Sequence, residues 1–135
     1  MSVVAVITGV AFGPWRIPHK GQTSLMLKYA QDHGLKIDYV VSEDTLSTTF
    51  PDLEYRIRQQ RVDEVVFTSA FQLPKSQREL SRISSFLGDK TLHFVLEGLS
   101  GTGHALIPSV QQEIVFFDRA GVITDRAQIQ TTPTL

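Results

Sequence analysis

The sequence predicts an α/β domain built on a mainly parallel β-sheet of four to five strands. Short, continuous apolar runs rich in β-branched residues recur along the chain, and such runs are typical of strands buried on both faces of a sheet. Segments with helical spacing of apolar residues separate these runs, so each crossover is long enough for a helix. The 135 residues, of which 41% are hydrophobic and 20% charged, suit one globular domain. Together these observations predict a three-layer sandwich.

Four apolar runs are the expected strands. The first, at 3–9, is the most continuous, and the others lie at 36–41, 63–69 and 90–96. Right-handed crossovers then favour a flavodoxin-like strand order of 2-1-3-4. In such a sheet the carboxyl ends of the parallel strands lie at one edge, where open α/β sheets bind their ligands.

Three helices are expected between these strands. The first covers 22–33 and ends at Gly34, because glycine commonly terminates a helix. The second begins near Thr49, and the third covers 75–87 and stops at Gly88.

The chain beyond the fourth strand is expected to contain a loop, a hairpin and a tail. Residues 97–104 form a glycine-rich loop, and 113–118 and 121–124 are predicted to form a C-terminal hairpin or to add an edge strand. Residues 128–135 are expected to be a flexible tail outside a single domain of 1–127.

Composition argues against several classes of function. A net charge of −1 gives no global basic field, so we expect no nucleic-acid partner and no attraction to a membrane surface. The absence of cysteine removes disulfides and thiolate metal sites and suits a cytoplasmic protein. The start lacks the basic region of a signal peptide, and no apolar run approaches the roughly 20 residues of a membrane span. The histidines show no metal-binding spacing, and we expect neither a metal nor another cofactor.

The long loop between the first strand and the first helix is the leading candidate for ligand binding. It carries Trp15, Arg16, His19 and Lys20 just ahead of a helix whose first N–H groups have no partner within the helix. Such a helix end beside a guanidinium suits a phosphate or carboxylate, although no P-loop or GxGxxG motif is present. We therefore expect an anionic ligand, with Gln22 in the same site.

Polar residues at the other strand ends complete the expected site. Glu97 ends one apolar strand and Glu43 follows another, and burial would raise the pKa of either carboxyl toward neutrality. Both are candidate catalytic acids, bases or nucleophiles, with a helix cap or a salt bridge as the structural alternative. The remaining expected ligand contacts are Ser42, Ser69, Gln72 and, over the crevice, His104.

Three segments resemble those of the small sporadic carbohydrate cluster proteins, which occur in bacterial gene clusters for surface-carbohydrate biosynthesis. They are Phe12-Gly13-x-x-Arg16-x-Pro18 leading to Gln22, Phe71-Gln72-Leu73-Pro74, and Leu92-His93-Phe94-Val95-Leu96-Glu97-Gly98-Leu99. The chain departs from that family at Thr23, where asparagine is expected, and matches it poorly after Gly98. The resemblance implies a role in carbohydrate biosynthesis.

The order of elements also resembles the catalytic domain of serine recombinases, which has the same strand and helix followed by a polar loop after the third strand. Those enzymes need a serine nucleophile just after the first strand and clustered arginines. This chain has Thr8 there, and Arg16 is the single arginine of that loop. DNA strand exchange is therefore disfavoured, because similarity of fold does not supply function.

The leading hypothesis from the sequence is a bacterial carbohydrate-biosynthesis protein that binds a phosphorylated or nucleotide-linked sugar. Arg16 would hold the anion, Glu97 would supply acid–base chemistry without a metal, and Trp15 would offer an apolar face. Isomerisation, elimination and glycosyl hydrolysis stay open, and so does whether the protein is an enzyme. The alternative is a noncatalytic scaffold or regulatory subunit that docks to a biosynthetic enzyme. In either case we expect a homo-oligomer.

Overall fold

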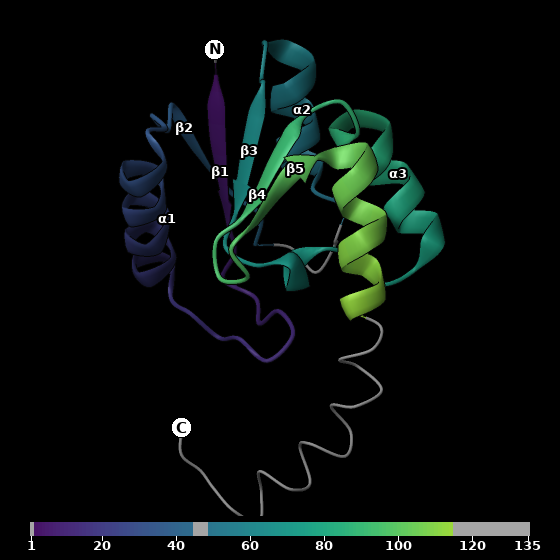
Figure 1. The fold of residues 1–135 in the computed structure, drawn as a ribbon, viewed down its shortest axis with the longest axis horizontal. Helices are drawn as coiled ribbons and strands as arrows, with labels where there is room; N and C mark the ends of the chain where they lie inside the picture. The colour runs from purple at the N-terminus through teal and green to yellow at the C-terminus, as the bar shows by residue number, and fades with distance from the viewer. Residues whose placement is uncertain (1, 45–48, 115–135) are drawn as a thin grey trace, which may run out of the picture.

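The computed structural model describes residues 2–44 and 49–114, which form one five-stranded sheet with helices on both faces (Figure 1). The strand order is β2-β1-β3-β4-β5, so the predicted order 2-1-3-4 is confirmed and a fifth strand extends it. Neighbouring strands from β2 to β4 pair in parallel, whereas β5 runs antiparallel to β4. The predicted α/β class is therefore confirmed.

Strands and helices alternate along the chain as the hydrophobic periodicity predicts. The elements are β1 (Val3–Ile7), α1 (His19–His33), β2 (Tyr39–Ser42), α2 (Pro51–Gln59), β3 (Glu64–Phe67), the 3-10 helix η1 (Ala70–Gln72), α3 (Gln77–Leu87), β4 (Thr91–Phe94) and β5 (Leu99–Thr102). A further helix covers 103–114. Among the described helices, none is long and apolar enough to cross a membrane.

The chain after β4 differs from the sequence-based prediction. It turns back at 95–98, where Gly98 has a φ of +67°, and β5 then pairs with β4. The segment expected to be a glycine-rich loop thus supplies an edge strand and the start of a helix. The predicted hairpin at 113–124 is wrong where it begins, because 113 and 114 are helical, and the rest of it lies outside the described residues, as does the expected tail at 128–135.

Two apolar layers hold the helices against the sheet. On one face, Val4 packs in a cluster with Leu53 of α2 and Ile83 of α3. On the other face, Ala5 packs with Met26 of α1. Every residue of β1 is buried, which explains why this strand is an unbroken apolar run rather than an alternating one.

A buried chain of polar groups ties α1 to the sheet. The hydroxyl of Tyr29 lies 2.8 Å from Nδ1 of His93, and Nε2 of His93 lies 2.7 Å from a carboxylate oxygen of Glu64. Burial, with Glu64 adding to it, raises the pKa of the Tyr29 hydroxyl. These contacts join α1, β4 and β3, so His93 serves the packing of the sheet, as expected for a residue within a strand.

Helix 103–114 begins at the edge of the sheet opposite the carboxyl ends of the parallel strands. The backbone N–H of His104 donates to the carbonyl of Gly88, just after α3, at 2.8 Å. The imidazole lies against Gly88, where an added Cβ would sit 2.3 Å from it. The expectation that His104 covers the ligand crevice is therefore wrong, because the hairpin of β4 and β5 carries this residue back to the other end of the molecule.

Candidate functional site

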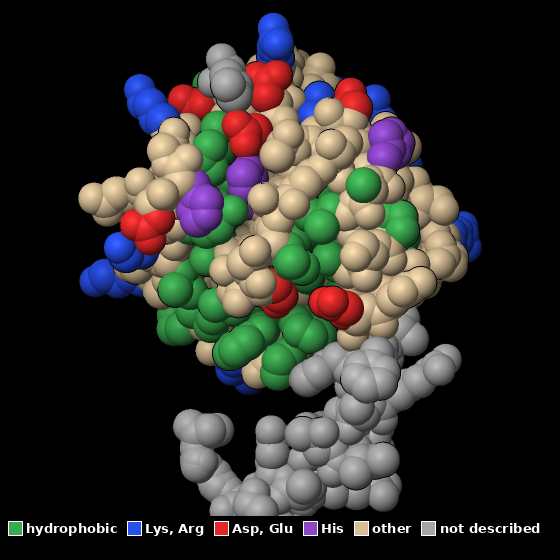
Figure 2. Space-filling view, viewed as in Figure 1, with side chains coloured by type: hydrophobic (Ala, Val, Ile, Leu, Met, Phe, Trp, Pro, Cys, Tyr) green, Lys and Arg blue, Asp and Glu red, His purple; other side chains and the backbone are tan. Residues whose placement is uncertain are grey.

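The carboxyl ends of β1, β2 and β3 meet at the lower edge of the sheet in Figure 1, where the loop 8–18 also lies. Nearly all of the predicted site residues come from this edge. Figure 2 shows the surface in the same view as Figure 1. Hydrophobic side chains cover much of its lower part, acidic side chains lie among them, and Lys and Arg are scattered around the outline. Any binding of an anion must therefore depend on local groups.

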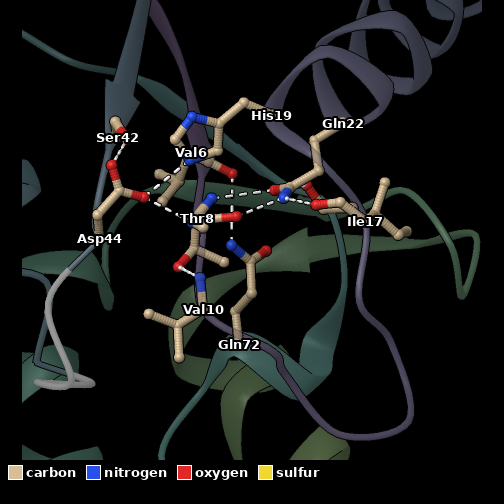
Figure 3. A network of polar contacts seen from close by, with 11 residues as sticks. Val6, Thr8, Val10, Ile17, His19, Gln22, Ser42, Asp44 and Gln72 are labelled. Carbon is tan, nitrogen blue, oxygen red and sulfur yellow. Dashed lines mark hydrogen bonds and ion pairs between the residues drawn. The ribbon is translucent and has the colours of Figure 1, made fainter.

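Gln22, in the first turn of α1, forms hydrogen bonds with the backbone that follows β1 (Figure 3). Its Oε1 accepts hydrogen bonds from the Thr8 backbone N–H and the Thr68 hydroxyl, both at 3.0 Å. Its Nε2 donates to the carbonyls of Thr8 at 2.5 Å and Ile17 at 2.6 Å. The side chain is fully buried. Gln22 was expected to bind a ligand, but the structure engages both ends of its amide within the protein.

Gln72, Ser69 and Glu97 form a second set of contacts, which fixes η1. Gln72 accepts from the Ser69 backbone N–H at 3.1 Å and donates to the carbonyl of Val6 at 3.4 Å. Ser69 donates its hydroxyl proton to Glu97 at 2.6 Å, and the second oxygen of Glu97 accepts from the Ala70 N–H at 2.8 Å. Glu97 was expected to be catalytic. Its two contacts hold the start of η1, which is the role of a helix cap that the sequence left open as the alternative.

Asp44 is a residue of this edge that the sequence analysis did not single out. It accepts hydrogen bonds from the Ser42 hydroxyl, from the Gly9 backbone N–H at 2.5 Å and from His19 Nε2 at 2.8 Å. The Ser42 hydroxyl is the largest of the effects that hold the pKa of the Asp44 carboxyl below its usual value. The sequence did offer a signal for Asp44. It lies just after the second strand, and the carboxyl ends of neighbouring parallel strands meet at one edge of a sheet. Ser42 and His19, both expected to contact a ligand, therefore converge on Asp44.

The loop after β1 presents its basic residues to solvent. A tight turn pairs the backbones of Phe12 and Trp15 at 3.0 Å in both directions, and Gly13 within it has a φ of +58°. Trp15 is 38% exposed. Arg16 and Lys20 are exposed as well, and neither forms an ion pair with another described residue. No side chain caps the start of α1, and no acidic residue lies in its first turn, so the positive end of this helix stays open to an anion.

A cavity of about 450 Å³ lies between this loop and the starts of α2 and α3. Its lining includes Thr8, Phe12 and Phe71, together with Glu43. Glu43 is 3% exposed, and one of its carboxylate oxygens accepts from the Leu53 backbone N–H of α2 at 2.6 Å. The other oxygen is buried and has no hydrogen-bond partner among the residues that the structure describes. Burial raises the pKa of this carboxyl above its usual value.

Just after β1, no hydroxyl of the described residues is paired with a basic side chain. The Thr8 hydroxyl accepts from the Val10 backbone N–H at 3.1 Å, and no basic side chain of the described residues is hydrogen-bonded to it. A hydroxyl needs such a base to become a nucleophile. Among the described residues no group of three or more His, Asp or Glu side chains is placed to hold a metal ion. The exposed loop and the cavity are the parts of this edge that a ligand could reach.

Comparison with known proteins identifies the fold. No protein-family model and no curated protein matches the chain. The N-terminal catalytic domain of TP901-1 integrase is similar with a TM-score of 0.63 and 15% identity, over 89% of this chain and 98% of that one. A resolvase-family site-specific recombinase from Streptococcus pneumoniae gives a TM-score of 0.57 and 17% identity, over 96% of this chain and 97% of that one. The chain has the fold of a recombinase catalytic domain.

These similarities correct the functional hypotheses drawn from the sequence. Both solved structures are recombinases rather than sugar-binding proteins, so the sugar ligand, the role in carbohydrate biosynthesis and the docking subunit of a biosynthetic enzyme are wrong. Nothing supports the resemblance to the carbohydrate cluster proteins, whereas the resemblance of element order to serine recombinases is confirmed for the fold. The exclusion of a nucleic-acid partner is also overturned by the two recombinase structures, and its premise was weak because a net charge summed over the chain does not describe one loop.

Replacing Gln22 by Leu is expected to lower the free energy of unfolding by about 3 kcal/mol or more. The N–H and C=O of Thr8 and the carbonyl of Ile17 would lose their partner, and each buried polar group left unsatisfied costs about 1–3 kcal/mol. Urea denaturation measures the change. Gln77→Leu is the matched control, since Gln77 bonds Gln111 at the exposed surface and a change within about 0.5 kcal/mol is expected. Equal losses in the two variants would contradict the role of Gln22.

Glu43→Gln is expected to raise the thermal midpoint of unfolding at neutral pH and to change it less near pH 4.5. Because burial raises the pKa of Glu43 in the folded state, its contribution to stability is fully present below the ordinary value of 4.5 and is lost as the pH rises through the raised pKa. The amide has no charge to bury at any pH. Thermal scans from acidic to neutral pH measure the difference, with the exposed Glu113→Gln as control. A difference that stays constant with pH would contradict this prediction.

Proposed function

We propose that this chain is a DNA-binding domain with the recombinase fold that does not cleave DNA. The observation that carries the proposal is the exposed loop before α1, in which Arg16 and Lys20 have no ion-pair partner among the described residues and flank an uncapped helix N-terminus. Arginine, lysine and helix N-termini are the groups that proteins use to hold DNA phosphates. Site-specific recombinases act on DNA, and both similar structures belong to this class.

Trp15 adds a second kind of contact to this loop. An exposed indole beside cationic side chains suits nucleic acid, because bases stack on aromatic rings while phosphates bind the charges. Trp15 is also the single tryptophan of the chain, so its fluorescence reports directly on the loop.

The absence of cleavage follows from the residues at the end of β1. Thr8, Gly9 and Val10 stand where serine recombinases need their nucleophilic serine, and the clustered arginines that those enzymes need are not in this loop. The hydroxyl of Thr8 is engaged by the Val10 N–H and lacks a base. The loop is thus equipped to hold a phosphate and not to attack it.

The first test measures binding of a short labelled DNA duplex by fluorescence anisotropy, with Trp15 emission as the second readout. Wild type is expected to bind with a Kd of about 10⁻⁴–10⁻⁶ M, as nonspecific DNA binders do. The double variant Arg16→Ala/Lys20→Ala is expected to bind more weakly. Its slope of log affinity against log salt should fall by about 2, because each lost phosphate contact removes about 0.9.

A charge-matched double variant controls for the change in net charge. Arg58→Ala/Arg61→Ala also removes two exposed positive charges, but its residues lie at and beyond the end of α2, where they pair with Glu54 and Asp63. This control should bind as wild type does. Equal losses in the two double variants, or no salt-dependent binding by wild type, would overturn the proposed phosphate-binding loop.

The second test asks whether the protein becomes covalently attached to DNA. Wild type incubated with supercoiled plasmid and then denatured is expected to give no protein–DNA adduct and no relaxed plasmid, because no serine stands just after β1 and the Thr8 hydroxyl has no basic partner among the described residues. An adduct that disappears in Thr8→Val would show that Thr8 attacks the phosphate and that the domain cleaves DNA.

A further inference from the structure

Asp44 contacts both ends of the exposed loop before α1. Its Oδ1 accepts a hydrogen bond from the Gly9 backbone N–H at 2.5 Å and lies 2.8 Å from Nε2 of His19. Gly9 lies just after β1, and His19 is the first residue of α1, so the two contacts bracket residues 10–18. One carboxylate oxygen therefore holds the start of the loop close to its end (Figure 3).

The second oxygen of Asp44 fixes the carboxylate relative to the sheet. Oδ2 accepts a hydrogen bond from the hydroxyl of Ser42, the last residue of β2, and β2 pairs with β1 along its length. The groups are closely packed, because a Cβ on Gly9 would lie 3.1 Å from Asp44 Oδ1 and 3.2 Å from His19 Nε2. The ends of the loop are thus held from a strand of the sheet and not only from the loop itself.

The two free cations of the loop lie next to its anchored residues. Arg16 precedes Ile17, whose carbonyl accepts a hydrogen bond from Gln22 at 2.6 Å. Lys20 follows His19 in the first turn of α1. Without the contacts of Asp44, the loop would keep its anchor at Ile17 and lose the one that holds its two ends together. The position of Arg16 relative to Lys20 would then vary more.

The charge of Asp44 and its hydrogen bonds have opposite effects on a phosphate at this loop. The pKa of the carboxyl lies below its usual value, with the Ser42 hydroxyl as the largest cause, so the group is ionised at neutral pH. Its side chain is 49% exposed, and a negative charge there repels a DNA phosphate. The hydrogen bonds act the other way, because a loop that is already ordered loses less conformational entropy when it binds.

We propose that Asp44 is a positioning residue for DNA binding, which orders the loop by holding Gly9 and His19 together and does not contact DNA itself. The proposal rests on the proposed function for the phosphate contacts of Arg16 and Lys20. It assigns the arrangement of these two cations to an acidic residue whose charge alone would weaken DNA binding.

The test compares Asp44→Asn with Asp44→Ala in the binding of labelled DNA. Asparagine removes the charge and keeps an oxygen that accepts both hydrogen bonds, so this variant should bind about twofold more tightly than wild type. Alanine removes the charge and the acceptor, so Asp44→Ala should bind about fivefold more weakly than wild type. The two variants have the same net charge. Changes in the same direction for both would overturn the proposal.

Asp32 provides the matched control. It is an exposed aspartate of α1 that pairs with Lys28 at 3.0 Å. Asp32→Asn and Asp32→Ala change the net charge as the Asp44 variants do, and both should bind DNA as wild type does. A difference between the two Asp32 variants as large as the one at Asp44 would overturn the positioning role.

Substitutions of His19 test the same contact from the other side and leave β2 unchanged. His19→Gln keeps an N–H donor for Asp44 and should bind DNA nearly as wild type does, whereas His19→Ala lacks the donor and should bind more weakly. Because Asp44→Ala already breaks this contact, adding His19→Ala to it should cause a smaller loss than His19→Ala causes in wild type. Additive losses would overturn the proposal.

Trp15 emission without DNA separates this proposal from the proposed function. Acrylamide should quench Trp15 more strongly in Asp44→Ala than in wild type or Asp44→Asn, because the loop is less ordered, and urea denaturation checks that each variant is folded. Equal quenching in all three would overturn the positioning role. The expected quenching in a protein that does not bind DNA would overturn the proposed function alone. DNA binding that Asp44→Ala leaves unchanged would overturn the positioning role alone.

Discussion

The hydrogen bonds of the Gln22 side chain determine how the chain is arranged at the carboxyl ends of β1 and β3. Thr8 follows the last residue of β1, and its buried backbone N–H and C=O lie beyond the strand pairing, which ends at Ile7. One amide supplies both an acceptor and a donor, so it satisfies the N–H and C=O of Thr8 together and still reaches Thr68 and Ile17. Each of these groups, if buried without a partner, would cost about 1–3 kcal/mol, and the sum is a large fraction of the stability of a small domain. Because Gln22 lies in the first turn of α1, the same contacts fix where the loop and the open helix end lie.

The second amide, Gln72, repeats this arrangement on the other side of β1. It joins η1 to the carbonyl of Val6, while Ser69 and Glu97 hold the start of η1. Polar residues at the carboxyl ends of strands are common candidates for catalysis, yet here they serve the backbone. The sequence does not distinguish the two roles, because both need a polar side chain at a strand end. What distinguishes them is whether an atom is left without a partner, as one oxygen of Glu43 is among the residues that the structure describes.

The fold could be predicted from the sequence to the extent that hydrophobic periodicity determined it. The buried strands β1, β3 and β4 are strongly apolar, and the helices between them have regular apolar stripes. The order of the strands and helices and the α/β class could therefore be predicted. The chain after β4 was predicted poorly for a physical reason. β5 contains Gly101 and is half exposed, which gives little strand signal, and Pro108 lies within helix 103–114, where proline ordinarily ends a helix. In this helix, the burial of Ile107 and Val110 in the core outweighs the tendency of Pro108 to end a helix.

The electrostatics of the loop explain why the net charge misled the functional prediction. At physiological ionic strength, exposed charges more than about 8 Å apart are largely screened, so a phosphate interacts with the few groups nearest to it. Asp44 is the acidic group of this edge closest to the loop, and its charge is already engaged by Ser42, Gly9 and His19. That pairing also removes His19 from the set of free cations, which leaves Arg16 and Lys20 as the groups available to an anion. A chain of net charge −1 therefore presents a locally cationic loop, and part of this loop lines the cavity at the carboxyl edge of the sheet.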